Sequence, residues 1–102
     1  MLIFNTTFHV DEKISDDYLN FFTEKYIPTC AASGFLFEPR FAKITSHSEQ
    51  GSVCYSLQFY AKNEDSINYW LTNGGKQLEG ELVEKFGQRV VGFITLMEEV
   101  AL

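Results

Sequence analysis

The chain has 102 residues and a formal net charge of −6, and 45% of its residues are hydrophobic and 16% are aromatic. This length and composition predict a single folded domain over residues 1–102, because a disordered chain carries far fewer apolar and aromatic side chains. The acidic balance argues against nucleic acid as a partner, since the Lys and Arg residues that neutralise phosphates supply most of that affinity, and it disfavours anionic membranes likewise.

The start of the sequence gives no sign of export or of a membrane span. The opening stretch, MLIFNTTFHVDEK, lacks a basic region and a long apolar run. We therefore expect a cytoplasmic protein. Its two cysteines, Cys30 and Cys54, are too few for a disulfide framework, and both are expected to be buried, reduced thiols.

The first half of the chain predicts a strand, a helix and a second strand. Residues 2–10 alternate between apolar and polar side chains, which is typical of a half-buried strand. A helix then begins at Ser15, whose hydroxyl is expected to cap it, and Pro28 predicts a kink or restart before the helix ends at Gly34. In the following stretch, FLFEPRFAKITSH, Pro39 indicates a sheet edge or a bulge, because proline cannot donate to a central ladder.

The second half predicts a strand, a helix and a last strand. After a polar turn at residues 46–52, the stretch GSVCYSLQFYA alternates with a period of two. A helix begins near Asn63, and Gly74 and Gly75 predict a break or kink inside it, because two glycines cost about 2 kcal/mol relative to alanines. Gly87 ends this helix, and the last strand, RVVGFITLM, is apolar on both faces.

The resulting order of elements, β-α-β-β-α-β, predicts an α+β fold of the ferredoxin-like type. We expect a four-stranded antiparallel sheet in the order 4-1-3-2, with both helices on one face and the other face open. The two edge strands carry more apolar side chains than one copy of the chain can cover. On the second strand, Phe37 and Phe41 are expected to share one face, opposite Leu36, Ala42 and Ile44.

A second copy of the chain is therefore expected to cover the open face. Burying roughly four extra large side chains favours association by about 6 to 12 kcal/mol before rigid-body and ordering costs. A two-fold homodimer in which one sheet faces the other satisfies this need. It also protects the edges of the sheet.

Several stretches of the chain are similar to a known family: Val10-Asp11-Glu12, Tyr26-Ile27-Pro28, Gly34-Phe35, Tyr55-Ser56-Leu57-Gln58, Phe86-Gly87 and Phe93-Ile94-Thr95-Leu96. They span nearly the whole chain and resemble the dimeric α/β barrel superfamily, and more closely a short bacterial family of unknown function with that fold. Tyr26 stands where that family often has a histidine. The resemblance implies a bacterial homodimer, and because its motifs are structural it predicts a fold and no activity.

The open face of the predicted sheet carries the candidate ligand-binding residues. Polar side chains of its two central strands would line a cavity between facing sheets: Asn5, Thr7, His9, Ser56, Gln58 and Tyr60. Our first hypothesis is a small-ligand site in this cavity. The competing interpretation is that these side chains hydrogen-bond across the dimer and fix its register.

The resemblance leaves two further functions open. Relatives in the superfamily include cofactor-free monooxygenases and isomerases, which implies that the protein could act on a small aromatic or carbonyl compound, with His9 or Tyr60 as the proton-transfer group. A regulatory amino-acid-binding module is a third hypothesis. Arg40 is expected to form an ion pair or to bind a substrate carboxylate. No metal and no cofactor are expected, because the histidines and cysteines lack zinc-ligand spacing and Gly75-Lys76-Gln77 lacks the Ser or Thr of a phosphate loop.

Overall fold

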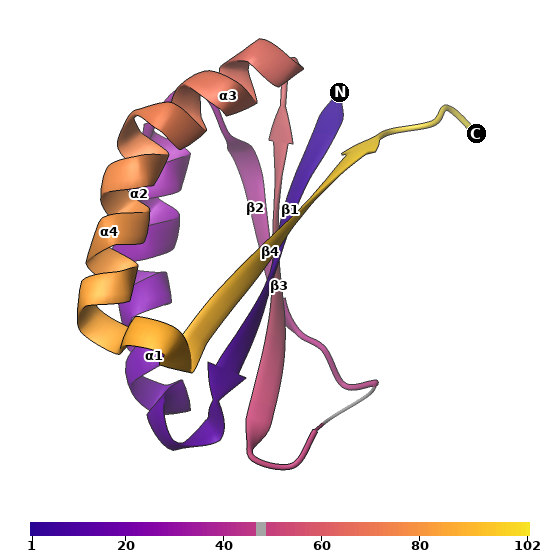
Figure 1. Cartoon of the computed structure of the whole chain (residues 1–102). Helices are drawn as coiled ribbons and strands as arrows, with labels where there is room; N and C mark the ends of the chain where they lie inside the picture. The colour runs from indigo at the N-terminus through magenta and orange to yellow at the C-terminus, as the bar shows by residue number, and fades with distance from the viewer. Residues whose placement is uncertain (47–48) are drawn as a thin grey trace.

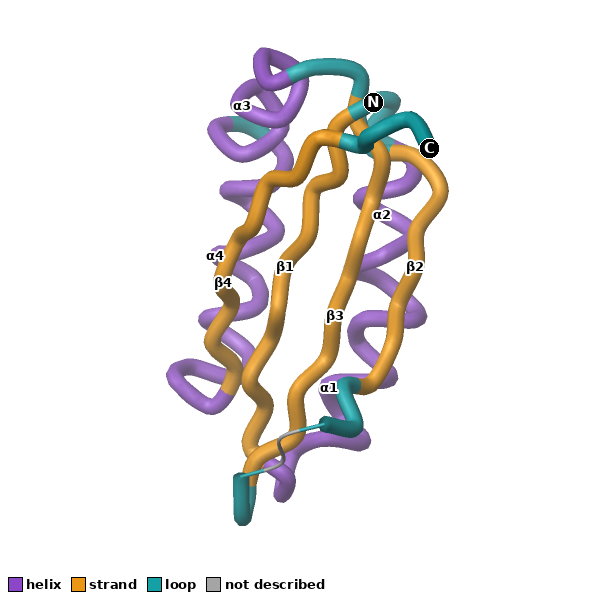
Figure 2. Tube along the Cα trace, turned by 90° about the vertical axis from the view of Figure 1, so that its right-hand side faces the viewer, coloured by secondary structure: helices purple, strands orange, loops and turns teal. Residues whose placement is uncertain are grey.

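The computed structural model describes residues 1–46 and 49–102, which form a sheet with helices on one face (Figure 1). The strands are β1 (Leu2–Asp11), β2 (Phe37–Lys43), β3 (Ser52–Ala61) and β4 (Val90–Glu98). They pair antiparallel in the order β2-β3-β1-β4, which confirms the predicted 4-1-3-2 sheet. Figure 2 looks onto the face that the helices leave open. The turn predicted at residues 46–52 includes His47 and Ser48, which lie outside the described residues.

The first helical segment begins one turn earlier than predicted. It consists of a 3-10 helix, η1 (Glu12–Ile14), followed by α1 (Ser15–Phe21), a π-helix, η2 (Phe22–Tyr26), and α2 (Ile27–Ala32). The Asp11 carboxylate accepts a hydrogen bond from the Lys13 amide at 2.9 Å, so the predicted Ser15 cap is wrong because Ser15 already lies within the helix. The expected kink or restart at Pro28 takes the form of the π-helical turn η2 just before it, while the backbone stays helical at Tyr26 and Ile27. Gly34, with φ +83°, follows the helix end.

The second helical segment is divided where its glycines predict. The Asn63 side chain accepts a hydrogen bond from the Ser66 amide at 2.8 Å and starts α3 (Glu64–Thr72). Asn73 separates this helix from α4 (Gly74–Phe86), which leads through a 3-10 helix, η3 (Gly87–Arg89), into β4. The break lets the backbone at Gly74 approach the buried indole of Trp70.

A bulge in β2 reverses the faces of its side chains. Phe37 pairs with Tyr60 of β3, but the next regular pair is Arg40 with Gln58, so β2 holds one extra residue there. The predicted bulge at Pro39 is thus confirmed. The predicted shared face of Phe37 and Phe41 is wrong, because the extra residue turns Phe41 toward the helices, opposite Leu57, and leaves Phe37 on the open side.

Aromatic rings fill the space between the sheet and the helices. Phe8 of β1 lies 4.9 Å from Phe22, which is itself 4.2 Å from Tyr18, measured between ring centres. Tyr55 and Phe41 extend the same cluster across β3 and β2. The fully buried hydroxyl of Tyr18 has no hydrogen-bond partner among the described residues. This cluster packs the helices against one face of the sheet, and the other face stays uncovered.

Strand β4 is covered on neither face within the described chain. Val90 is buried, but every later residue of the strand is exposed, including Phe93 at 57% and Ile94 at 52%. Figure 1 shows the reason, since the C-terminal half of β4 extends away from the helical layer. This exposure agrees with the prediction that one copy leaves both faces of the strand uncovered.

Candidate functional site

The strand register sets the predicted polar residues in rows across the open face. Gln58 of β3 pairs with Asn5 of β1 on one side and with Arg40 of β2 on the other. Because paired residues of antiparallel strands point to the same face, these three side chains share the open face. Thr95 of β4 completes the row, opposite Asn5. A polar band therefore crosses the whole sheet.

Asn5 is held by hydrogen bonds to its own strand, β1, and to the adjacent strand, β3. The Ser56 hydroxyl donates to Asn5 Oδ1 at 2.7 Å, and Asn5 Nδ2 donates to Thr7 Oγ1 at 3.3 Å. Asn5 is only 8% exposed, and both ends of its amide find a partner within one chain. These bonds order the centre of the face, and the neighbouring Gln58 amide makes no side-chain hydrogen bond within the described residues.

His9 and Tyr60 lie at opposite ends of the open face. His9 Nδ1 lies 3.3 Å from Cys54 Sγ, and its ring packs edge-on against Phe93. The expectation that both cysteines are buried holds for Cys30 but is wrong for Cys54, which is half-buried on the open face. The Tyr60 hydroxyl donates to Glu99 Oε2 at 2.7 Å, and this hydrogen bond raises the pKa of Tyr60. The predicted residues thus form separate groups along the face.

A small hollow lies at the Tyr60 end of this face. Its volume is about 100 Å³, and it is lined by Ile3, Glu38, Arg40, Gln58, Phe59 and Tyr60. Gln58 and Tyr60 belong to the predicted set, and Arg40 is the residue expected to form an ion pair or to bind a substrate carboxylate. The structure therefore brings these three side chains together, while His9 lies too far along β1 to join them.

A second cavity, which the sequence did not predict, lies between the sheet and the helices. It has a volume of about 140 Å³, and its walls are mostly apolar, with Trp70, Leu82 and Ile94 among them. Tyr26 and Cys30 also line it, and burial raises the pKa of both, that of Cys30 to about 12. Their spacing of four residues places both on one helix face, but that spacing does not reveal whether a cavity lies beside the face.

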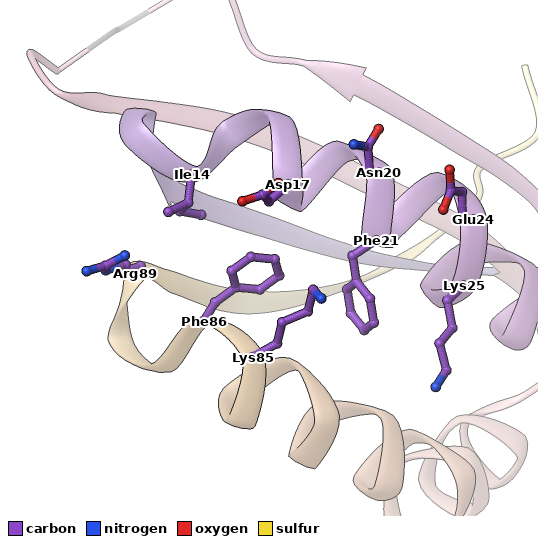
Figure 3. Close-up of a pocket in the computed structure, with 9 residues that line it drawn as sticks. All are labelled: Ile14, Asp17, Asn20, Phe21, Glu24, Lys25, Lys85, Phe86 and Arg89. Carbon is purple, nitrogen blue, oxygen red and sulfur yellow. The ribbon is translucent and has the colours of Figure 1, made fainter.

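A groove larger than either of these runs between the two helical segments (Figure 3). It measures about 570 Å³, and charged side chains of α1, η2 and α4 alternate along it. The Lys85 ammonium lies 5.7 Å from the centre of the Phe21 ring and 5.9 Å from that of Phe86. Lys25 pairs with Glu81 at 2.9 Å. These are contacts of a solvated helix boundary, where long side chains cover aromatic rings, and we assign them no binding role.

The described residues offer no metal centre, since no three of their His, Cys, Asp or Glu side chains converge. None of the helices in the described ranges is long and apolar enough to cross a membrane. The open face and the cavity between sheet and helices are the two candidate places for a small molecule that we pursue.

The order of the elements and the open sheet face define a protein with the ferredoxin-like α+β fold. The chain belongs to a family described as a domain of unknown function, DUF4286, which matches residues 1–100. This confirms the resemblance to a family of unknown function. No curated protein matches the sequence.

Solved structures share the fold at low sequence identity. An EthD family protein from Bacillus halodurans has 13% identity and a TM-score of 0.70, covering 98% of this chain and 100% of that one. A protein from Deinococcus radiodurans, provisionally assigned as an antibiotic biosynthesis monooxygenase, has 13% identity and a TM-score of 0.71, with 100% and 95% covered. A dimeric ferredoxin-like protein from an uncultured marine organism has 12% identity and a TM-score of 0.56, with 99% and 97% covered. These similarities extend to the fold alone.

Proposed function

We propose that this chain is a single domain that forms a homodimer in the bacterial cytoplasm and binds a small ligand between two facing sheets. The observation that carries this proposal is the apolar rim of the open face. Val91, Phe93 and Met97 of β4 are 43%, 57% and 36% exposed on the face that carries the polar band. Apolar side chains gathered at one edge of an otherwise polar face are typical of an interface.

Covering this rim favours association. Burying three such side chains completely contributes about 5 to 9 kcal/mol. Because these side chains are already partly buried, the dimer gains only the share that corresponds to their exposed surface. The costs of association are subtracted from that gain. One structural neighbour is itself described as dimeric, which supports the same assembly. A sheet that faces its two-fold copy also encloses the polar band and so forms a cavity.

The ligand-binding part of the proposal rests on the polar side chains that would line this cavity. Thr7, His9, Gln58 and Tyr60 are the candidate contacts, and Asn5 holds the centre of the face in place. Gln58 can offer both an amide donor and a carbonyl acceptor to a ligand. The two ends of the face differ in chemistry, because His9 meets a thiol and Tyr60 meets a carboxylate.

Sedimentation velocity tests the homodimer with a matched pair of variants. We expect the native chain to sediment as a dimer of 11.7 kDa subunits and Phe93→Ser to sediment as a monomer. Val83→Ser is the control, because Val83 is similarly exposed, at 56%, but lies on α4 in the helical layer. A native monomer, or equal dissociation of both variants, would contradict the assembly.

A second candidate function uses the cavity between the sheet and the helices. The mostly apolar walls suit a small aromatic or carbonyl compound, the substrate class of the enzyme hypothesis. The Tyr26 hydroxyl is protonated near neutral pH, as tyrosine ordinarily is, and burial raises its pKa further. It can therefore donate a hydrogen bond to a carbonyl oxygen of an isomerase substrate.

Thermal shift with acetophenone as the probe tests this second candidate. The native chain is expected to melt at a higher temperature with the ketone, and Tyr26→Phe to lose that increase. Tyr69→Phe, at a tyrosine that is 55% exposed on α3, is expected to keep it. An equal response of all three proteins would leave Tyr26 without a role in binding.

A further inference from the structure

The bulge in β2 changes which face of the sheet Arg40 occupies. In a regular strand, Phe37 and residue 39 would share a face, and Arg40 would point toward the helices. The extra residue in the bulge instead pairs Arg40 with Gln58 and places it on the open face. Glu38, inside the bulge, has φ +52°, a conformation that residues with a β-carbon rarely adopt. The chain thus holds a strained residue at the point that redirects an arginine.

Arg40 has no ion-pair partner in the part of the chain that the structure describes, where Lys25 and Glu81 form the one pair. Its neighbours in the hollow are Gln58, across the strand pair, together with Ile3 and the ring of Tyr60. The carboxylate of Glu99 accepts a hydrogen bond from the Tyr60 hydroxyl and forms no ion pair with Arg40. Glu38 also lines the hollow, yet it lies beyond ion-pair distance of the guanidinium.

A facing sheet makes this lack of a partner important. When a second copy covers the open face, the guanidinium is taken out of water, and a charge removed from water without a partner is strongly unfavourable. A carboxylate removes that penalty best, because its two oxygens match the fork of guanidinium N–H groups. The Gln58 amide stands beside this position to donate to the same group, and Ile3 offers an apolar wall.

We propose that Arg40 binds the carboxylate of a small organic acid with an apolar body, in the cavity between the two sheets. This inference rests on the proposed homodimer and names the class of its ligand. Gln58 is the second donor, and the apolar part of the acid lies along Ile3 and the Tyr60 ring. A carboxylate of the partner subunit is the competing occupant of the same guanidinium.

Calorimetric titration with benzoate, and with benzamide as its uncharged counterpart, tests the proposal. We expect the native dimer to bind benzoate at least tenfold more tightly than benzamide. Arg40→Gln is expected to weaken benzoate binding at least tenfold and to leave sedimentation as a dimer unchanged. Lys43→Gln removes the same charge from the same strand, on the face opposite Arg40, and is expected to bind benzoate like the native chain.

Each other outcome is informative. The proposal is overturned if the native chain does not bind benzoate, if it binds benzamide equally well, or if Arg40→Gln binds benzoate normally. Dissociation of Arg40→Gln into monomers also overturns it, since Arg40 then pairs with the partner subunit. A native monomer whose benzoate binding is lost in Arg40→Gln would contradict the homodimer but support the carboxylate site, so the two failures are distinguishable.

Discussion

A β-carbon at position 74 would lie 2.5 Å from Cζ3 of the Trp70 indole, so only glycine fits where α3 gives way to α4. Trp70 is 7% exposed and cannot move aside freely. We expect Gly74→Ala to lower the free energy of unfolding by about 1 to 3 kcal/mol, although alanine is the better helix former, because overpacking outweighs helix propensity. Urea unfolding followed by circular dichroism measures the difference.

Gly80 supplies the control for this prediction. It lies in the same helix, and a β-carbon there would meet nothing within 4 Å. Gly80→Ala is therefore expected to stabilise the protein by about 0.5 to 1 kcal/mol. If both variants changed stability in the same direction, the close approach of Gly74 to Trp70 would not explain the helix break.

The hydrogen bond between Ser56 and Asn5 can be measured by a double-mutant cycle. Asn5→Ala is expected to cost about 1 to 3 kcal/mol of unfolding free energy, because it leaves polar groups of Ser56 and Thr7 unpaired at a nearly buried site. Adding Ser56→Ala to it should cost less than the sum of the single changes, with a coupling of about 0.5 to 1.5 kcal/mol. Additive effects would show that the bond contributes nothing within the subunit.

The sequence predicted the sheet because its strands alternate with a period of two and its helices end at glycines. It did not predict which face Phe41 occupies, because one extra residue at Glu38 and Pro39 reverses the alternation without changing composition. The open-face residues were correctly placed on one face, but sequence spacing alone does not fix the contacts that separate them into groups, such as His9 with Cys54. The cavity at Tyr26 and Cys30 depends on how far the helices stand from β4, a tertiary distance.

The buried thiol of Cys30 predicts a loss of stability in alkali. Burial raises its pKa from the usual 9.0 to about 12, so the folded state keeps the proton that the unfolded chain releases. The folded pKa is raised, so the contribution is complete below pH 9 and is lost progressively as the pH rises toward 12. Between pH 8 and 10 the loss from this one thiol is about 1.4 kcal/mol at most.

Urea unfolding at pH 8 and at pH 10 measures this loss. Cys30→Ala is expected to fall less in stability between the two pH values than the native chain, because the titrating thiol is gone. Cys54→Ala, which removes the half-buried thiol of the open face, should retain the full decrease. Tyr18 and Tyr26 add their own loss in all three proteins, since burial raises the pKa of both hydroxyls. Equal decreases in every variant would assign the alkaline sensitivity to these tyrosines and not to Cys30.

Glu38 tests whether the β2 bulge is strained. It is the one non-glycine residue of the described ranges with positive φ, at +52°, and a β-carbon disfavours that conformation by about 1 to 2 kcal/mol. Glu38→Gly relieves the strain but gains freedom in the unfolded chain, so we expect a net stabilisation of about 0.5 to 1 kcal/mol in urea unfolding. Glu38→Gln keeps the β-carbon and removes only the charge, and it should leave stability nearly unchanged. A similar gain in both variants would mean that repulsion by the Glu38 carboxylate, and not its backbone, limits stability. A gain confined to Glu38→Gly would mean that the fold tolerates strain at the residue that turns Arg40 onto the open face.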